Sequence, residues 1–296
     1  MIKLGADHHI EGGHDFDTPM GSMELGGYLV QAGKIRPADV HRILHVQQEE
    51  NLRFGEAAVR LGLVTEKDVQ EALAAQFAFP VFSGSQQQKY KDVVAAHSPF
   101  SAEVEKLRAL RTELVVRKPE EGDAGIFAVV SPGKAEGRSY IASNLAVLFA
   151  QIGKRTLLID ADLRNPCQHN YFHVDNSKGL SAVLSGRAPA DSAEQPKGLA
   201  NLFVMPSGQL PPNPLELLSR YALSLVLQSL TDKYDRIILD SPAGIAFADA
   251  QAVSAHAGFA LMVTRRHQTP LRAAKKLAEG IATSGAKLIG TVITDY

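Results

Sequence analysis

The chain lacks several features that would place it in common protein classes. Its single cysteine, Cys167, excludes an internal disulfide and fits a reducing compartment. No apolar stretch approaches the length of a membrane span, and the polar start of the chain lacks a signal-peptide core. The formal net charge is −1, with 31 Lys and Arg against 32 Asp and Glu. Because bulk charge gives no sign of nucleic-acid binding, we expect no nucleic-acid partner.

Length and composition fit two domains. The 296 residues exceed one typical domain, and a hydrophobic content of 45% can supply sizeable cores. We predict a disordered leader over residues 1–21, a small helical domain over 22–82, a linker over 83–100 and an α/β domain over 101–296. The linker is predicted from its Ser, Gly and Gln-rich beginning.

Two aspartates follow an apolar run in the second half of the chain. Residues 157–159 are apolar, and Asp160 and Asp162 come directly after them, two residues apart. A period of two places both carboxylates on one side of a strand tip. Such a pair is costly unless a cation neutralises it, and a hard cation carried by a phosphate ligand would do so. The alternative is a strand followed by an ordinary acidic turn.

A second apolar run, over 126–130, leads into a glycine-bearing loop and then a helical pattern that ends at Gly153. This order is the context of a phosphate-binding loop, in which backbone N–H groups and the helix N-terminus cradle phosphates. Gly137, Arg138 and Ser139 stand where the motif has Gly-Lys-Ser/Thr, and Pro132 replaces its leading glycine. Ser139 can place a hydroxyl on a metal, and Arg138 can supply a positive charge as a planar fork. The alternative is an ordinary strand-to-helix turn.

A third apolar run, over 237–239, follows Arg236 and ends at Asp240. In nucleotide-binding sheets such an aspartate reaches the metal or orients the attacking group, although it can also be a helix cap or turn former. Further strands are expected over 202–205, 259–264 and 288–294. Polar residues at the carboxyl ends of several apolar strands predict a mostly parallel α/β sheet, flanked by helices, with its ligand at that edge.

Two further segments add to this pattern. Residues 208–218 form a proline-rich turn followed by a helical stretch, and Glu105, Arg108 and Arg111 are spaced by three along a predicted helix. Together with the three strand ends, these segments resemble the cytoplasmic domain of bacterial tyrosine kinases over residues 100–296. That family consists of P-loop proteins with deviant Walker motifs, related to cell-division and partition ATPases. In it, the Glu-x-x-Arg-x-x-Arg spacing is a self-association motif; without the resemblance it would indicate a solvated helix face.

The resemblance implies Mg²⁺-assisted phosphoryl transfer from ATP, with ADP as product. It assigns the metal to Ser139, Asp162 and Asp240. Asp160 would be the base that positions a tyrosine hydroxyl or water, with Arg138 and Asp162 as the other catalytic residues. The implied nucleotide-binding residues are Gly133, Lys134, Ala135, Glu136, Gly137, Arg138, Ser139 and Tyr140.

Two departures from the family pattern bear on function. Arg138 replaces the phosphate-binding lysine, and the sequence ends in one tyrosine, Tyr296, where relatives have a tyrosine cluster. Three functions stay open: a tyrosine autokinase that controls exopolysaccharide chain length, a catalytically weak nucleotide-gated assembly regulator, and a partition-type ATPase. The resemblance also implies self-association, with a ring as one form of it, and a separate membrane-embedded polysaccharide co-polymerase as activator. It implies a cytoplasmic protein, peripheral at the inner membrane through that partner.

The first third of the chain contains a tandem repeat. Residues 24–47 and 53–76 align with an offset of 29, and each copy reads as a short helix, a glycine stop and a longer helix. The pattern resembles the MshEN domain of type II secretion ATPases, which can bind cyclic di-GMP. The residues that the resemblance assigns to this ligand are Leu25, Gly26, Gln47, Arg53, Gly55 and Gln76. Glu24 stands where the first copy would carry an arginine, and a glutamate there would repel the ligand phosphates.

The alternative for the repeat is that its glycines and glutamines serve only the packing of helices. The combination of such a domain with a bacterial tyrosine kinase domain resembles the EpsG-type chain-length determinant kinases of exopolysaccharide gene clusters.

Overall fold

The computed structural model describes residues 24–76, 89–116 and 125–295, and the chain divides into two compact units, 1–79 and 80–296. The predicted leader, 1–21, lies outside the described residues. Helices of the first unit are α1 (Leu25–Gln31), α2 (Pro37–Glu50), α3 (Phe54–Arg60) and α4 (Glu66–Gln76). Those of the second unit are α6 (Val94–His97), α7 (Ala102–Val116), α8 (Arg138–Gln151), α9 (Gln168–Phe172), α10 (Leu180–Leu184), α11 (Pro214–Leu218), α12 (Tyr221–Leu230), α13 (Asp249–Ala257) and α14 (Leu271–Thr283). Among the described residues, no helix combines the length and apolarity needed to cross a bilayer.

In the first unit, each repeat packs its short helix on the long helix of the other repeat. The short helices α1 and α3 end before Gly33 and Gly62, whose φ angles of 68° and 66° are left-handed. Helix α1 packs on α4, and α3 packs on α2, so each short helix contacts the long helix of the other repeat. Their buried side chains, including Leu29, Ile43 and Ala58, form one core. The two repeats therefore share one core.

The second unit is built on a six-stranded sheet in which every strand pair is parallel. Its strands are β1 (Ile126–Ser131), β2 (Thr156–Asp160), β3 (Leu202–Met205), β4 (Arg236–Ala243), β5 (Phe259–Arg265) and β6 (Lys287–Thr294), in the spatial order β3-β2-β4-β1-β5-β6. These strands coincide with the six apolar runs, so the predicted fold class is confirmed. The chain goes from β1 to β2 in one direction and from β4 to β5 in the other, which makes the end of β1 the switch point where α/β sheets bind ligands.

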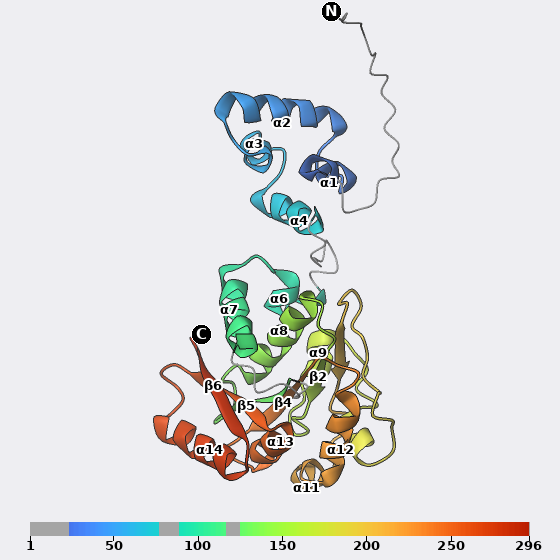
Figure 1. The fold of residues 1–296 in the computed structure, drawn as a ribbon, viewed down its shortest axis with the longest axis vertical. Helices are drawn as coiled ribbons and strands as arrows, with labels where there is room; N and C mark the ends of the chain where they lie inside the picture. The colour runs from blue at the N-terminus through green and yellow to red at the C-terminus, as the bar shows by residue number, and fades with distance from the viewer. Residues whose placement is uncertain (1–23, 77–88, 117–124, 296) are drawn as a thin grey trace, which may run out of the picture. The chain divides into compact units, whose positions relative to one another are not determined.

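Helices cover both faces of this sheet (Figure 1). Alternate strand residues such as Val129 and Leu158 join α6, α7, α8 and α9 in one core. Their neighbours Val130 and Ile159 face the opposite core, which includes residues of α10 to α14. Because both faces are buried, the strands are continuous apolar runs and show no polar alternation.

The structure differs from the predicted linker over 83–100. Its described part, 89–100, packs on the α/β unit: Tyr90 and Val93 are fully buried, and the Tyr90 hydroxyl donates to the Lys197 carbonyl at 2.8 Å. Helix α6 is fixed by the buried Asn144 of α8, whose Oδ1 accepts the Ala95 N–H at 2.8 Å. The apolar residues in this stretch therefore belong to the core of the α/β unit. Because polar residues precede them in the sequence, the predicted start of this unit was too late in the chain.

Replacing Asn144 should destabilise the α/β unit. Asn144→Ala leaves the Ala95 N–H buried without its partner, which costs about 1–3 kcal/mol of unfolding free energy. For a unit of this size we expect the melting temperature to fall by about 2–10 °C, measured by circular dichroism. Ser229→Ala, at an exposed hydroxyl on α12, is the control and should leave it unchanged. Equal melting temperatures for the two variants would contradict the role of this bond.

Candidate nucleotide site

Three polar segments meet where β1, β2 and β4 end. Asp160 at the end of β2 lies opposite Asp240 of β4 in the strand register, and β4 also pairs with β1. The loop after β1 bends through Ala135 and Gly137, with φ angles of 56° and 91°, and α8 begins at Arg138. Its N-terminal backbone N–H groups therefore point toward the edge where the aspartates lie, as an anion-binding helix terminus requires.

A cavity of about 510 Å³ opens at this helix terminus. Six of the eight predicted nucleotide-binding residues line it, from Ala135 to Tyr140. Gly133 and Lys134 do not: the Gly133 N–H donates to Glu136 Oε2 at 2.9 Å, and Lys134 is exposed. Lining residues that the sequence did not indicate are Glu103, Cys167, Tyr171 and Arg265.

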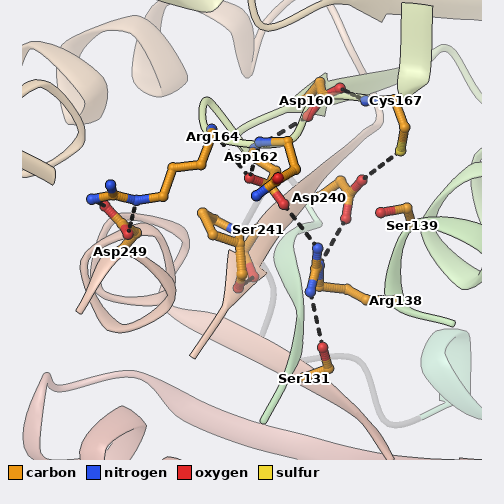
Figure 2. Close-up of polar contacts among 12 residues, drawn as sticks. Ser131, Arg138, Ser139, Asp160, Asp162, Arg164, Cys167, Asp240, Ser241 and Asp249 are labelled. Atoms are coloured by element: carbon orange, nitrogen blue, oxygen red, sulfur yellow. Dashed lines mark hydrogen bonds and ion pairs between the residues drawn. The ribbon is translucent and has the colours of Figure 1, made fainter. Parts of the chain in front are cut away.

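Arg138 lies between three polar groups from separate elements (Figure 2). Its Nη2 donates to Asp162 Oδ2 at 3.0 Å and its Nε to Asp240 Oδ1 at 3.2 Å. Its Nη1 donates to Ser131 Oγ at 2.9 Å. The side chain is only 10% exposed. The guanidinium is thus the positive charge at the two carboxylates that were predicted to hold a metal, and its planar fork lets it bond to all three groups.

Asp160 is enclosed by backbone donors. Its Oδ1 accepts the Asp162 N–H at 3.1 Å, and its Oδ2 accepts the N–H groups of Cys167 and Gln168, both at 3.0 Å. Burial raises the pKa of this carboxyl well above its usual range, and the charge of Asp240 raises it further. The residue is fully buried and does not line the cavity. It therefore organises the turn after β2.

Asp240 connects the phosphate-loop helix to the turn after β2. Burial raises its pKa, and Arg138 acts in the opposite direction, as do hydrogen bonds from the side chains of Gln168 and Ser139. The Gln168 amide donates to Asp240 Oδ2 at 2.8 Å and to the Ser139 carbonyl at 3.2 Å. Gln168 was not predicted, because a glutamine in a short helix carries no motif.

These donors fit a small hard cation that is shared with phosphate. Asp162 and Asp240 offer carboxylate oxygens and Ser139 a hydroxyl, the ligand types that Mg²⁺ prefers. Within the described residues, no group of three or more His, Cys, Asp or Glu side chains could hold a metal on its own. That agrees with Mg²⁺ sites in which phosphate oxygens and water complete the coordination.

The phosphate loop is braced by Glu136. This buried carboxylate accepts the Gly133 N–H and also the Thr269 hydroxyl, the latter at 2.5 Å. The Glu136 carbonyl accepts the Thr294 hydroxyl at 2.9 Å. Threonines on the segment after β5 and at the end of β6 therefore fix the loop conformation, which sequence motifs alone could not indicate.

Arg164 ties the turn after β2 to the start of α13. Its guanidinium donates to both oxygens of the buried Asp249, at 2.9 and 3.2 Å, and its Cζ lies 3.7 Å from the centroid of the Phe247 ring. The Arg164 N–H donates to Asp162 Oδ1 at 3.2 Å. This fork holds the backbone that orients Asp162 (Figure 2). The Leu-Arg-Asn-Pro segment was noticed in the sequence, but Asp249, 85 residues away, gave no signal.

The predicted self-association residues lie on α7. Arg108 pairs with Glu105 on the same helix. Arg111 donates to the Leu148 carbonyl of α8 at 3.0 Å, and burial lowers the pKa of its guanidinium. Arg111 thus contributes to the packing of α7 on α8, whereas Glu105 is exposed.

In the helical unit, the two motif glycines allow close helix packing. A Cβ on Gly26 would lie 3.1 Å from Phe54 Cζ, and one on Gly55 would lie 2.6 Å from Val69 Cγ1. This close packing agrees with the alternative that the glycines serve helix packing, and their assignment to a cyclic di-GMP site stays a prediction. Arg53 is exposed, and Gln47 and Gln76 are half-buried.

The sequence comparisons identify tyrosine-protein kinases among the relatives of this chain, although no family model matches it. Tyrosine-protein kinase YwqD of Bacillus subtilis is 36% identical over 210 residues, which are 71% of this chain and 87% of the relative. Tyrosine-protein kinase wzc of Salmonella typhimurium is 30% identical over 74% of this chain. The match spans only 30% of that longer relative.

Solved structures show the same likeness. The kinase domain of Escherichia coli tyrosine kinase ETK matches with a TM-score of 0.65 and 31% identity, over 68% of this chain and 79% of that domain. The septum site-determining protein MinD of Pyrococcus horikoshii, in complex with Mg-ADP, matches with a TM-score of 0.50 and 26% identity, over 57% and 69% of the two chains.

The thiol of Cys167 should react slowly with disulfide reagents, although Cys167 lines the cavity. Burial raises its pKa to about 12, and the Asp240 and Asp160 carboxylates contribute to the rise. A raised pKa keeps the thiol protonated. At pH 8 the thiolate is therefore present in about one molecule in ten thousand, whereas an ordinary cysteine is about one quarter thiolate at that pH. We expect reaction with a chromogenic disulfide to be at least about a hundredfold slower in the native protein than in the guanidinium-unfolded protein. Since the chain has one cysteine, the signal is unambiguous. Equal rates would show that the thiolate is exposed.

Proposed function

Because this chain belongs to the family of bacterial tyrosine-protein kinases, we propose that it binds Mg-ATP at residues 132–139 and transfers the γ-phosphoryl group to tyrosine. The acceptors would include tyrosines of other copies of this chain. Its biological role in this proposal is the control of exopolysaccharide chain length. The observation that supports the proposal best is the contact of Arg138, at the start of the phosphate-loop helix, with both candidate metal ligands, Asp162 and Asp240.

The proposed chemistry assigns one task to each group. Backbone N–H groups at the start of α8 and the Arg138 guanidinium would bind the β- and γ-phosphates, and Mg²⁺ would neutralise charge on them. A tyrosine oxygen bonds to the γ-phosphorus while the bond to the β,γ-bridging oxygen breaks, and ADP leaves with that electron pair. The tyrosine proton goes to Asp160, whose raised pKa suits a proton acceptor. Because Asp160 is fully buried, the site must open for this step.

A nucleotide-gated regulator is the second candidate. Arg138 already bonds to two carboxylates and a serine, so phosphates must compete with these groups for the guanidinium. Such competition would slow turnover while nucleotide binding still changes the site. A partition-type ATPase has less support, since the likeness to MinD is weaker in TM-score than the likeness to the tyrosine kinase domain.

We extend the proposal to partners and location. The chain would act in the cytoplasm, at the inner membrane, where a separate membrane-embedded co-polymerase would activate it. Self-association, including a ring, would use the part of α7 around the exposed Glu105 and the half-buried Arg108. Arg111 would contribute indirectly, because its bond to the Leu148 carbonyl holds α7 on α8.

The helical unit is proposed to bind cyclic di-GMP. Two copies of one sequence pattern contribute to its core, and cyclic di-GMP is itself made of two equivalent halves. Gly26 and Gly55 would act indirectly, by letting α1 and α3 approach their neighbours. The exposed Arg53 would bond to a phosphate or guanine edge, and Leu25, Gln47 and Gln76 would be the other ligand-binding residues.

Asp162→Ala should remove the metal dependence of nucleotide binding. The variant loses a carboxylate ligand of Mg²⁺. Calorimetric titration with ADP, in Mg²⁺ and in chelator, should show at least about a tenfold Mg²⁺ effect in the parent and none in the variant. Asp191→Ala, at an exposed aspartate that pairs with Lys233, should behave as the parent. An equal Mg²⁺ effect in parent and Asp162→Ala would refute the metal assignment.

Arg138→Lys should separate turnover from stability. A lysine ammonium cannot span Ser131, Asp162 and Asp240 together, so we expect a lower melting temperature without nucleotide. ATP turnover should stay equal or rise, because a lysine suits the usual phosphate loop. Phosphate release and thermal melting measure the two effects, with the exposed Arg272→Lys as control. A loss of turnover beyond about tenfold would show that the loop is built for arginine.

Cyclic di-GMP binding should depend on the negative charge of Glu24 in the first repeat and the positive charge of Arg53 in the second. We expect micromolar affinity, about 8 kcal/mol, for the parent. Glu24→Arg should tighten binding by removing repulsion, and Arg53→Ala should abolish it. Fluorescence anisotropy with labelled cyclic di-GMP gives the affinities, and Arg60→Ala is a matched control in the same unit. Lack of saturable binding in both the parent and Glu24→Arg would leave the repeat as a helical packing module.

A further inference from the structure

A second cavity, of about 490 Å³, lies beyond the carboxyl end of β3. It is formed by α10, the proline-rich segment over 209–213, and α11 with the residues that follow it. None of its lining residues lines the nucleotide cavity. The two cavities therefore offer separate binding sites along the same edge of the sheet.

The floor of this cavity is fixed by backbone contacts. The N–H groups of Leu180 and Ser181 donate to the carbonyls of Pro206 and Ser207 at 2.8 and 2.9 Å. Gly179 is required there, because a Cβ at this position would lie 2.2 Å from the Pro206 carbonyl oxygen. The start of α10 and the segment after β3 are thus held together, which makes the cavity a preformed feature.

One buried polar group at the cavity has no partner. Ser181 is 1% exposed and lines the cavity, and its Oγ has no hydrogen-bond partner among the described residues. Buried hydroxyls are almost always bonded, and an unbonded one carries a desolvation cost. A ligand with a hydrogen-bonding oxygen would satisfy it.

The charge of the lining favours an anion. Arg187 and Arg220 line the cavity, and the Arg187 Nε–H donates to Ser185 Oγ at 2.9 Å, which orients its guanidinium. The single lining carboxylate, Glu216, accepts the Asn213 amide at 2.9 Å. Two guanidinium groups against one carboxylate leave a net positive charge, and guanidinium forks suit phosphate oxygens.

The rest of the lining is apolar. Leu210, Pro211 and Pro212 form part of the wall, and Leu210 is 68% exposed. An apolar wall beside two arginines and a serine hydroxyl suits an anion on a flat apolar stem. We propose that this cavity binds a phosphotyrosine side chain, with the ring against the leucine and prolines and the phosphate on Arg187, Arg220 and Ser181. A second copy of this chain would supply the phosphotyrosine, and this source rests on the proposed kinase function. The proposed binding does not depend on that function.

Peptide binding to the full chain tests this site. The probe is a fluorescein-labelled peptide with one phosphotyrosine among glycines and serines, titrated in saturating Mg-ADP to occupy the nucleotide cavity. Fluorescence anisotropy should show saturable binding, and the unphosphorylated peptide should bind at least tenfold more weakly. Arg187→Gln and Arg220→Gln should each weaken binding at least tenfold. Arg272→Gln, an exposed arginine on α14, should match the parent.

Competition and a conservative variant complete the test. Phenyl phosphate should displace the probe at lower concentration than inorganic phosphate, because only the former has the ring. Ser181→Ala should weaken binding without lowering the melting temperature. Parent-like binding in both arginine variants, or equal binding of the unphosphorylated peptide, would overturn the proposal. Since Mg-ADP binding is titrated separately, failure here is distinct from failure of the kinase assignment.

Discussion

The contact of Arg138 with Asp162 and Asp240 is the interaction on which the rest of the site depends. Parallel strands bring carboxylates to one edge of the sheet, where burial makes uncompensated charge expensive. One guanidinium compensates two of them, and it belongs to the first residue of the phosphate-loop helix. The same charge that stabilises the folded site is therefore the charge that nucleotide phosphates would recruit, which couples stability to ligand binding.

The surrounding residues keep this charge arrangement in place. Asp160 collects three backbone N–H groups and shapes the turn that carries Asp162. Arg164 then anchors that turn to Asp249, so the loops that follow β2 and β4 are held at a fixed separation. Because these groups are buried and bonded, the side of the site that would hold phosphate and metal is organised before any ligand binds, as electrostatic stabilisation of phosphoryl transfer requires. Only the proposed proton transfer to Asp160 needs the site to open.

Local patterns predicted the sheet well, because each strand is an apolar run and three of them end in polar residues. They also identified Arg138 as the unusual member of the phosphate loop. Contacts between distant segments were beyond the sequence: Asp249 gave no sign of its pairing with Arg164. Residues 89–100 were read as a linker because a polar stretch precedes them, although Tyr90 and its neighbours are buried. The bond of Arg111 to the Leu148 carbonyl of α8 also gave no sign in the sequence, and the predicted role of Arg111 in self-association stays a prediction.

A double-mutant cycle of Arg138→Gln and Asp162→Asn on the free energy of unfolding tests the account most directly. Arg138→Gln leaves both carboxylates without the guanidinium, and Asp162→Asn leaves Arg138 with Asp240 alone. In the double variant only the Asp240 carboxylate lacks its partner. The account predicts that the double variant loses less stability than the sum of the single losses, by at least about 1 kcal/mol. Additivity within about 0.5 kcal/mol would show that the two residues do not act as one electrostatic unit, and would contradict the account.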